Sequence, residues 1–176
     1  MCAEIWHLYD AEGKKTDFSF VRGKGNYRDI PEGLYHLVVD FLILHEDGTY
    51  LMTKRSDDKD VYPGYWEASG GGSAILDETP EEALRREMRE ETGIVSDDFE
   101  LINITFSANH GMFYSYLVRT SCKKDSIVLQ KGETVDYKWV DVKGYIDYVD
   151  SGKELSMVNH NNRYKTYIDG LREKME

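Results

Sequence analysis

The chain has 176 residues, of which 40% are hydrophobic and 31% are charged. This composition is typical of a globular domain, and no apolar run approaches the roughly 18 residues that a membrane-spanning helix needs. The formal net charge of −11 argues against long nucleic acid as a partner, because phosphate-backbone binding needs a clustered basic surface. A small anionic ligand is compatible with this charge if the carboxylates first bind a divalent cation. The N-terminus lacks the form of a secretory signal, so we expect a cytoplasmic protein.

The N-terminal part of the chain is expected to form two hairpins. Two β-prone runs, residues 4–9 and 17–21, flank a turn-rich segment and predict the first hairpin. With the glycine-rich loop that follows, it makes an N-terminal extension of residues 1–33. Residues 34–44 are almost entirely apolar and predict a central strand, and residues 49–55 follow an Asp-Gly turn as its partner.

One predicted helix has clear signals at both ends. Thr79 has the N-cap position, Pro80 the first helical position, and Glu82 completes a capping box. Gly93 is typical of the residue that ends a helix. The sequence therefore predicts a helix over residues 80–92.

The remaining elements suggest a layered fold. Strands before and after one central helix, with a terminal helix to cover the other face, indicate an α/β/α sandwich with a mixed sheet, and we expect residues 1–176 to form one domain. The further strands are expected at residues 99–108, 112–119, 126–129 and 134–140, and the further helices at residues 142–149 and 158–174.

The central helix carries a group of carboxylates that could hold a cation. Glu87, Glu90 and Glu91 are spaced i, i+3 and i+4, so they project from one face within one turn. Mg²⁺ takes oxygen ligands and is often held by a few carboxylates together with substrate phosphates. Mixed glutamates and arginines on a helix more often form a solvated face. The three glycines at residues 70–72 favour a site, because they let the backbone approach a ligand closely and offer carbonyl oxygens.

Residues 72–94 resemble the signature of the Nudix hydrolases. That signature is a glycine, five residues, a glutamate, seven residues, and then Arg-Glu-apolar-x-Glu-Glu-x-Gly-apolar. With average residue usage, a chance match of all nine positions in a chain of this length is roughly one in ten million or rarer. The matching residues are Gly72, Glu78, Arg86, Glu87, Met88, Glu90, Glu91, Gly93 and Ile94.

The resemblance implies the Nudix sandwich fold and a pyrophosphatase activity. Its substrate would be a nucleoside diphosphate derivative or a related small diphosphate, cut by attack of water on phosphorus with Mg²⁺, or alternatively Mn²⁺, as cofactor. The family often forms dimers, which implies a possible homodimer. Arg86 would orient the glutamates, and Glu78 would organise the loop. The metal would be bound by Glu87, Glu90, Glu91 and the carbonyl of Gly71 or Gly72.

Three residues outside the signature are candidates for further roles. Nudix enzymes often take a proton acceptor from the signature itself, as Glu90 could provide, or from a loop before a late strand, where Glu133 lies. An exposed loop glutamate is an equally good description of Glu133. Arg55 and Lys54, at the end of a strand, could bind phosphate, and we expect one of the two to be solvated.

Two other functions compete with hydrolysis. The segments LYHLVV and YPGYWEAS resemble Nudix proteins related to isopentenyl-diphosphate isomerase, which needs a cysteine and metal-binding histidines. Gly71 stands at the cysteine position and Ser73 at the histidine position, so the hydrolase is preferred. A non-catalytic nucleotide-binding Nudix module is the third candidate, but such modules are expected to lose metal glutamates that this chain keeps.

Overall fold

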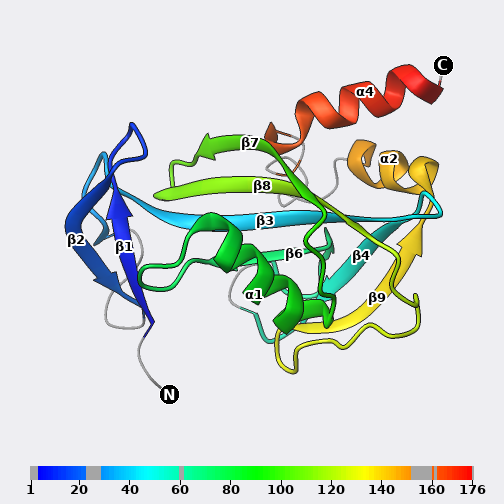
Figure 1. The fold of residues 1–176 in the computed structure, drawn as a ribbon, viewed down its shortest axis with the longest axis horizontal. Coiled ribbons are helices and arrows are strands. Elements are labelled where there is room, and N and C mark those ends of the chain that lie inside the picture. Colours follow the sequence, from blue (N-terminus) through cyan, green and yellow to red (C-terminus); the bar gives the residue numbers. More distant parts are fainter. Residues whose placement is uncertain (1–3, 23–28, 60–61, 152–159, 161, 176) are drawn as a thin grey trace.

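The computed structural model describes residues 4–22, 29–59, 62–151, 160 and 162–175, and within them nine strands and three helices (Figure 1). The helices are α1 (Pro80–Thr92), α2 (Val142–Asp150) and α4 (Lys165–Met175). The strands are β1 (Ile5–Tyr9), β2 (Lys15–Val21), β3 (Tyr35–His45), β4 (Tyr50–Arg55), β5 (Trp66–Ala68), β6 (Gly70–Ser73), β7 (Phe99–Phe106), β8 (Gly111–Thr120) and β9 (Thr134–Val140).

The sheet is mixed and is organised around β3. This strand runs parallel to β8 along its whole length and antiparallel to β1, β4 and β6. The hairpin partner β2 continues the sheet beyond β1, while β5 and β9 pair with β4, and β7 pairs with β8. The apolar run that predicted a central strand thus forms one, as expected for a strand covered on both faces.

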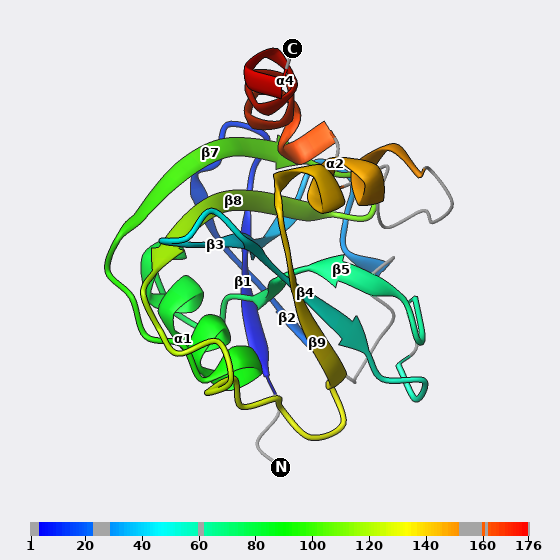
Figure 2. The ribbon, with the colours of Figure 1, turned by 90° about the vertical axis from the view of Figure 1, so that its right-hand side faces the viewer.

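Helices cover both faces of the sheet, which makes the predicted α/β/α sandwich (Figure 2). Successive side chains of a strand point to opposite faces. Val39 and Phe41 therefore pack with α1 residues such as Leu84 in one hydrophobic cluster. Leu42 packs on the other face with residues of α2 and α4, including Ile168. That residues 1–176 act as one domain stays a prediction.

Helix α1 has the predicted bounds because its end signals form the expected contacts. The Thr79 hydroxyl accepts a hydrogen bond from the Glu82 backbone N–H at 3.2 Å, and the Glu82 carboxylate accepts one from the Thr79 N–H at 2.8 Å. Gly93 adopts a left-handed conformation with φ of 73° and donates its N–H to the Arg89 carbonyl. Both ends of the helix are thus satisfied by local groups.

Two sequence predictions need correction. Residues 126–129 do not form a strand, because their backbone groups bond elsewhere: the Val128 N–H donates to the Thr92 carbonyl at the end of α1, at 2.9 Å. The predicted C-terminal helix is interrupted: residues 160, 162 and 163 are helical, residue 164 is a turn, and α4 follows over Lys165–Met175, while residues 158, 159 and 161 of that prediction lie outside the described residues.

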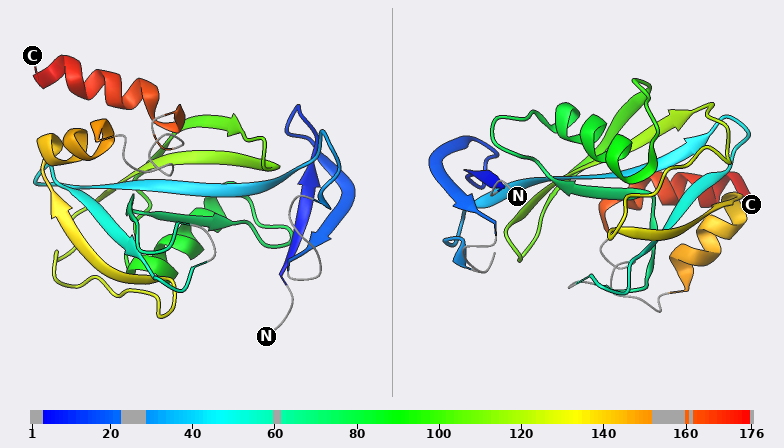
Figure 3. Two further views of the ribbon diagram at one scale, coloured as in Figure 1. Left: turned by 180° about the vertical axis from the view of Figure 1, so that it is seen from behind. Right: turned by 90° about the horizontal axis from the view of Figure 1, so that it is seen from below.

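The N-terminal hairpin forms one end of the molecule, away from α2 and α4 (Figure 3). It starts from β1, which pairs with the beginning of β3 through Leu8 and Tyr9. The hairpin is therefore an extension of the same sheet, as predicted. None of the described helices combines the length and apolar character required to cross a bilayer.

Candidate active site

The glycines of β6 leave room for the glutamate side chains of α1 to pack against the sheet. A Cβ atom added at Gly70 would lie 2.1 Å from Oε2 of Glu91, and one added at Gly72 would lie 2.2 Å from Oε1 of Glu87. Any side chain at these two positions would displace the carboxylates. The glycines are therefore needed for close approach rather than for flexibility, since β6 is a paired strand.

Glu91 is held by the backbone of this glycine strand. Its Oε2 accepts a hydrogen bond from the Gly71 N–H at 2.9 Å, and no described cation forms a salt bridge with it. Burial raises the pKa of Glu91 well above its usual range, and the negative charges of Glu67 and Glu87 raise it further. Glu91 therefore lies among other negative charges and has no positively charged partner in the described part of the chain.

Arg86 links the other glutamates of the signature into one network. It donates to both oxygens of Glu78 at 2.7 and 2.8 Å and to the Ser73 carbonyl at 3.0 Å. Its Nη1 also donates to Glu87 at 2.7 Å and to the exposed Glu90 at 3.3 Å. Burial raises the pKa of Glu87, whereas the charge of Arg86 lowers it. The structure therefore brings the predicted residues Arg86, Glu87 and Glu90 together.

Glu67 belongs to the same centre but was missed by sequence reasoning. It lies on β5, its charge acts on Glu91, and Arg55 donates to its two oxygens at 3.1 and 3.3 Å. Burial raises the pKa of Glu67, and the nearby Arg55 lowers it. A charged residue at a half-buried strand position just before the glycines was the signal that could have identified it.

The two predicted phosphate-binding residues lie on different faces of β4. Tyr50 and Met52 belong to the cluster on the α2 and α4 face, and alternation places Lys54 on that face. Arg55 lies on the opposite face, which is the face of α1, and forms the ion pair with Glu67. The structure therefore brings Arg55 to the glutamate centre and separates Lys54 from it.

Glu133 stands at the edge of the centre, just before β9. Lys59 forms an ion pair with its carboxylate, and the Ser56 N–H donates to its carbonyl at 2.8 Å. Its negative charge contributes to the raised pKa of Glu91. Glu133 is thus close enough to act electrostatically on the centre, although it is 38% exposed.

The centre fits a divalent cation by its donor chemistry. Glu87, Glu90 and Glu91 offer oxygen ligands, and a cation would offset the charges of Glu67 and Glu87 that add to the effect of burial in raising the pKa of Glu91. In the described ranges no three carboxylate, histidine or cysteine side chains are already arranged around one ion position. Arg86 holds Glu87, so a metal would compete with this arginine for that carboxylate.

The position of Gly71 argues against the isomerase alternative. A Cβ atom added there would lie 2.4 Å from the Val39 carbonyl oxygen and 2.9 Å from Cα of Asp40. The backbone of β3 thus leaves no room for the cysteine side chain that the isomerase would need at this position. Ser73, at the histidine position, uses its carbonyl to hold Arg86.

Comparisons with known proteins identify the family. The family model described as NUDIX domain matches residues 34–157. An uncharacterised Nudix hydrolase, lmo0368 from Listeria monocytogenes, is 30% identical over 138 residues, which cover 78% of this chain and 79% of the relative. The nucleoside triphosphatase NudI from Escherichia coli is 33% identical over 117 residues, which cover 60% of this chain and 82% of NudI.

A solved structure supports the same fold. The crystal structure of DR0079 from Deinococcus radiodurans superposes with a TM-score of 0.67 at 19% sequence identity, covering 85% of this chain and 90% of that protein. The mixed sheet, the helices on both faces and the glutamate-bearing α1 agree with the sequence matches. This chain belongs to the Nudix family of hydrolases, which act on acid anhydrides.

Proposed function

We propose that this protein is a Mg²⁺-dependent hydrolase that cleaves a diphosphate linkage by attack of water on phosphorus. The observation that carries the proposal is the packing of Glu87 and Glu91 against the glycine strand β6, with Glu91 lacking a cationic partner among the described residues. Such a centre is costly for the folded protein unless a cation binds, because like charges gathered away from water repel each other.

The proposed metal ligands come from α1 and β6. They are Glu87, Glu90, Glu91 and the carbonyl oxygen of Gly72, with Mg²⁺ as the cation and Mn²⁺ as its substitute. When bound, the cation supplies neutralisation of the diphosphate charge and activation of water. Arg86 acts as a positioning residue, because it fixes Glu87 and ties Glu78 to the β6 carbonyl of Ser73.

Two further residues are proposed to act on the substrate and the water. Glu133 accepts the proton of the attacking water, and its ion pair with Lys59 holds it at the edge of the centre, where its charge acts on Glu91. Arg55 binds a phosphate oxygen from its position next to Glu67. Lys54 has no such role in the proposal, because alternation along β4 places it on the other face.

The proposed substrate is a small nucleoside diphosphate derivative, which includes nucleoside triphosphates. The relative NudI is named a nucleoside triphosphatase, and an acidic protein of net charge −11 can bind a nucleotide through its metal without binding long nucleic acid. The cytoplasmic location, the homodimer and the single domain of residues 1–176 stay predictions of the same account.

The proposal is tested by incubating the protein with Mg²⁺, H₂¹⁸O and a panel of nucleoside triphosphates, nucleotide sugars, ADP-ribose and isopentenyl diphosphate. We expect a product that carries ¹⁸O on phosphorus, formed only with metal, and loss of this product in Glu90→Gln. Glu82→Gln is the matched control, because it removes the same charge from α1 while glutamine preserves the capping box. Conversion of isopentenyl diphosphate without cleavage, or full turnover by Glu90→Gln, would refute the proposal.

A further inference from the structure

The N-terminal hairpin, β1 and β2, is fixed to the loop that leads into α1. The Leu76 N–H donates to the Ile5 carbonyl at 2.8 Å, and Trp6 and Leu76 form an isolated β-bridge. Asp77, the next residue in that loop, forms an ion pair with Lys15 of the hairpin, and its carboxylate lies 3.2 Å from Nε2 of His7. The hairpin lies outside the residues matched by the NUDIX model, yet it contacts the signature directly.

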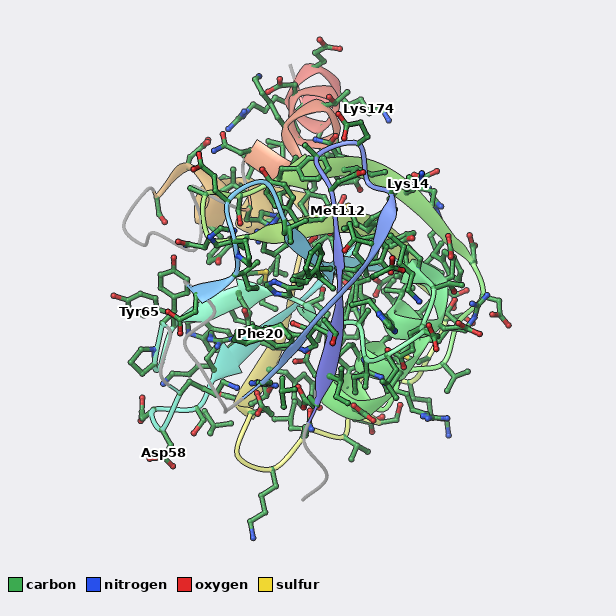
Figure 4. The ribbon with its side chains drawn as sticks, turned by 90° about the vertical axis from the view of Figure 1, so that its left-hand side faces the viewer. Lys14, Phe20, Asp58, Tyr65, Met112 and Lys174 are labelled. Atoms are coloured by element: carbon green, nitrogen blue, oxygen red, sulfur yellow. The ribbon has the colours of Figure 1, made fainter. Side chains whose placement is uncertain are left out.

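The open end of the hairpin carries an arginine. Figure 4 looks onto the hairpin, which runs from its turn near Lys14 past Phe20 towards the end of β2. At that end the Arg22 N–H donates to the Glu4 carbonyl at 2.9 Å, and Nη1 of Arg22 donates to the Glu4 carboxylate at 2.7 Å. The guanidinium lies 6.0 Å from the ring centre of Trp6. The buried Trp6 ring stacks on the His36 ring, with the ring centres 4.3 Å apart. The aromatic ring near the Arg22 guanidinium is therefore fixed in place.

Arg22 and Glu4 are within electrostatic reach of the glutamate centre. The hydrogen bond with Glu4 is the main reason that the pKa of Arg22 is raised, and the charges of Glu133 and Glu87 contribute to the same direction. Glu4 is also among the charges that raise the pKa of Glu87. Ile5, the residue after Glu4, accepts the hydrogen bond from Leu76 in the loop before α1, so the pair of Arg22 and Glu4 also lies beside the signature segment.

Arg22 has donor capacity that Arg86 lacks. A guanidinium has five N–H donors, and Arg86 uses all five on Glu78, Glu87, Glu90 and the Ser73 carbonyl. Within the described ranges Arg22 makes one side-chain hydrogen bond, through Nη1, and its side chain is 56% exposed. A planar guanidinium held on one nitrogen can present the others to phosphate oxygens.

We propose that Arg22 is a substrate-binding residue that the N-terminal hairpin supplies to the diphosphate group. Glu4 and Trp6 hold its guanidinium at the rim of the glutamate centre. This inference rests on the proposed function, because it places a diphosphate at that centre. It assigns the hairpin a part in substrate recognition beyond the residues matched by the family model.

The test measures binding without turnover. Calorimetry with methylenediphosphonate, a diphosphate that water cannot cleave, is carried out in Mg²⁺ for the wild type, Arg22→Gln, Arg22→Lys and Lys15→Gln. We expect about tenfold weaker binding for Arg22→Gln and about threefold for Arg22→Lys, which keeps the charge but loses the planar fork. Lys15→Gln removes the same charge from the same hairpin but faces Asp77, so its affinity should stay that of the wild type.

The kinetic readout separates substrate binding from a structural role. On the substrate found in the hydrolysis panel, Arg22→Gln should raise KM about tenfold and leave kcat within about twofold. Equal losses in Arg22→Gln and Lys15→Gln, or no loss in Arg22→Gln, would overturn the inference. If Arg22→Gln unfolds, Arg22→Lys decides: about threefold weaker binding of the diphosphonate beside wild-type binding by Lys15→Gln supports the inference, and unchanged binding by Arg22→Lys counts against it.

The two proposals fail in different ways. A wild type that binds methylenediphosphonate through Arg22 but hydrolyses nothing on the panel refutes the hydrolase proposal and leaves this inference standing. Metal-dependent hydrolysis with an unchanged KM in Arg22→Gln supports the hydrolase proposal and overturns this inference. Failure of the wild type to bind the diphosphonate overturns the inference.

Discussion

Asp40 and Glu91 are carboxylates on opposite faces of the sheet. Both are largely shielded from water, but the groups that surround them differ. Asp40 of β3 is buried among partners: the Ser115 hydroxyl donates to its Oδ1 at 2.5 Å, and Nε of Arg163 lies 2.7 Å from its Oδ2. Glu91 of α1 has the Gly71 N–H and further carboxylates around it. Burial raises the pKa of both groups. Only Asp40 has a cation and a hydroxyl to offset its desolvation.

The comparison separates a structural carboxylate from a functional one. A buried charge with a complete set of partners holds elements together, here the sheet and the residues just before α4. A partly buried charge without a cation lowers stability, and it is retained where a ligand supplies the missing charge. Removing the charge of Glu91 should therefore raise the stability of the metal-free protein, whereas removing the charge of Asp40 should lower it.

The largest effect is expected on catalysis, from Glu91→Gln. Removing a metal ligand at the centre should lower kcat by about 10³-fold, because metal stabilisation of the reacting phosphate accounts for several kcal/mol. Without metal, the same change should raise the midpoint of thermal unfolding, since it removes repulsion with Glu67 and Glu87. Kinetics and thermal scans on one preparation measure both. If Glu91→Gln were less stable than the wild type and had a normal kcat, Glu91 would be a structural carboxylate and not a functional one.

The second effect is expected on stability, from Asp40→Asn. This change leaves Arg163 without its carboxylate and should lower the free energy of unfolding by about 3 kcal/mol. Activity per folded molecule should change little, because Asp40 lies on the face away from α1. Urea denaturation measures the loss, and Asp147→Asn, which breaks an exposed ion pair with Lys143, is the control expected to show none. Equal free energies of unfolding for Asp40→Asn and Asp147→Asn would contradict the structural role of Asp40.

The third effect tests why the sheet carries glycines beside Glu87. Gly72→Ala places a Cβ atom against the Glu87 carboxylate and should weaken metal binding about 10- to 100-fold by shifting this ligand. Gly170→Ala is the control, because nothing lies near a Cβ atom in that part of α4. This control should stabilise the helix by about 1 kcal/mol without changing activity. Unchanged metal affinity in Gly72→Ala would show that the close approach is not needed.

The smallest effect is a pH dependence from the Asp40 face. Burial, together with the charge of Arg163, lowers the pKa of His160 to about 3. The unfolded chain binds a proton below about pH 6.5 that the folded chain does not, so stability present above pH 6.5 is lost as the pH falls towards 3. The loss should reach up to about 1.4 kcal/mol per pH unit. Urea titrations at pH 7 and 5.5 should give a smaller difference for His160→Asn than for the wild type, and equal differences would refute this.

Local signals made α1 predictable residue by residue. The capping box of Thr79 and Glu82 and the left-handed Gly93 act within a few positions of the chain, so the helix ends follow from sequence alone. The same is true of the signature glutamates, whose spacing fixes a common helix face. The strand predicted at residues 126–129 failed for the opposite reason. Its backbone groups are satisfied by the end of α1 and a local turn, which is tertiary information.

Contacts between distant segments could not be predicted from the sequence. The strand β6 consists of three glycines and a serine with low strand propensity, and it forms because β3 pairs with it. Glu67 reaches the centre only through the pairing of β5 with β4. Lys54 and Arg55 are neighbours in sequence, and the alternation of β4 separates them. Such side-chain placement depends on register and on which face of the strand is buried.

The most direct test of the central claim is a Mn²⁺ titration followed by electron paramagnetic resonance, with Mn²⁺ standing in for Mg²⁺. The account predicts that the wild type and Asp40→Asn bind Mn²⁺ with equal affinity and that Glu91→Gln binds it at least tenfold more weakly. Mn²⁺ binding by Glu91→Gln as tight as that of the wild type would contradict the claim that the unpaired carboxylate beside β6 is the metal site.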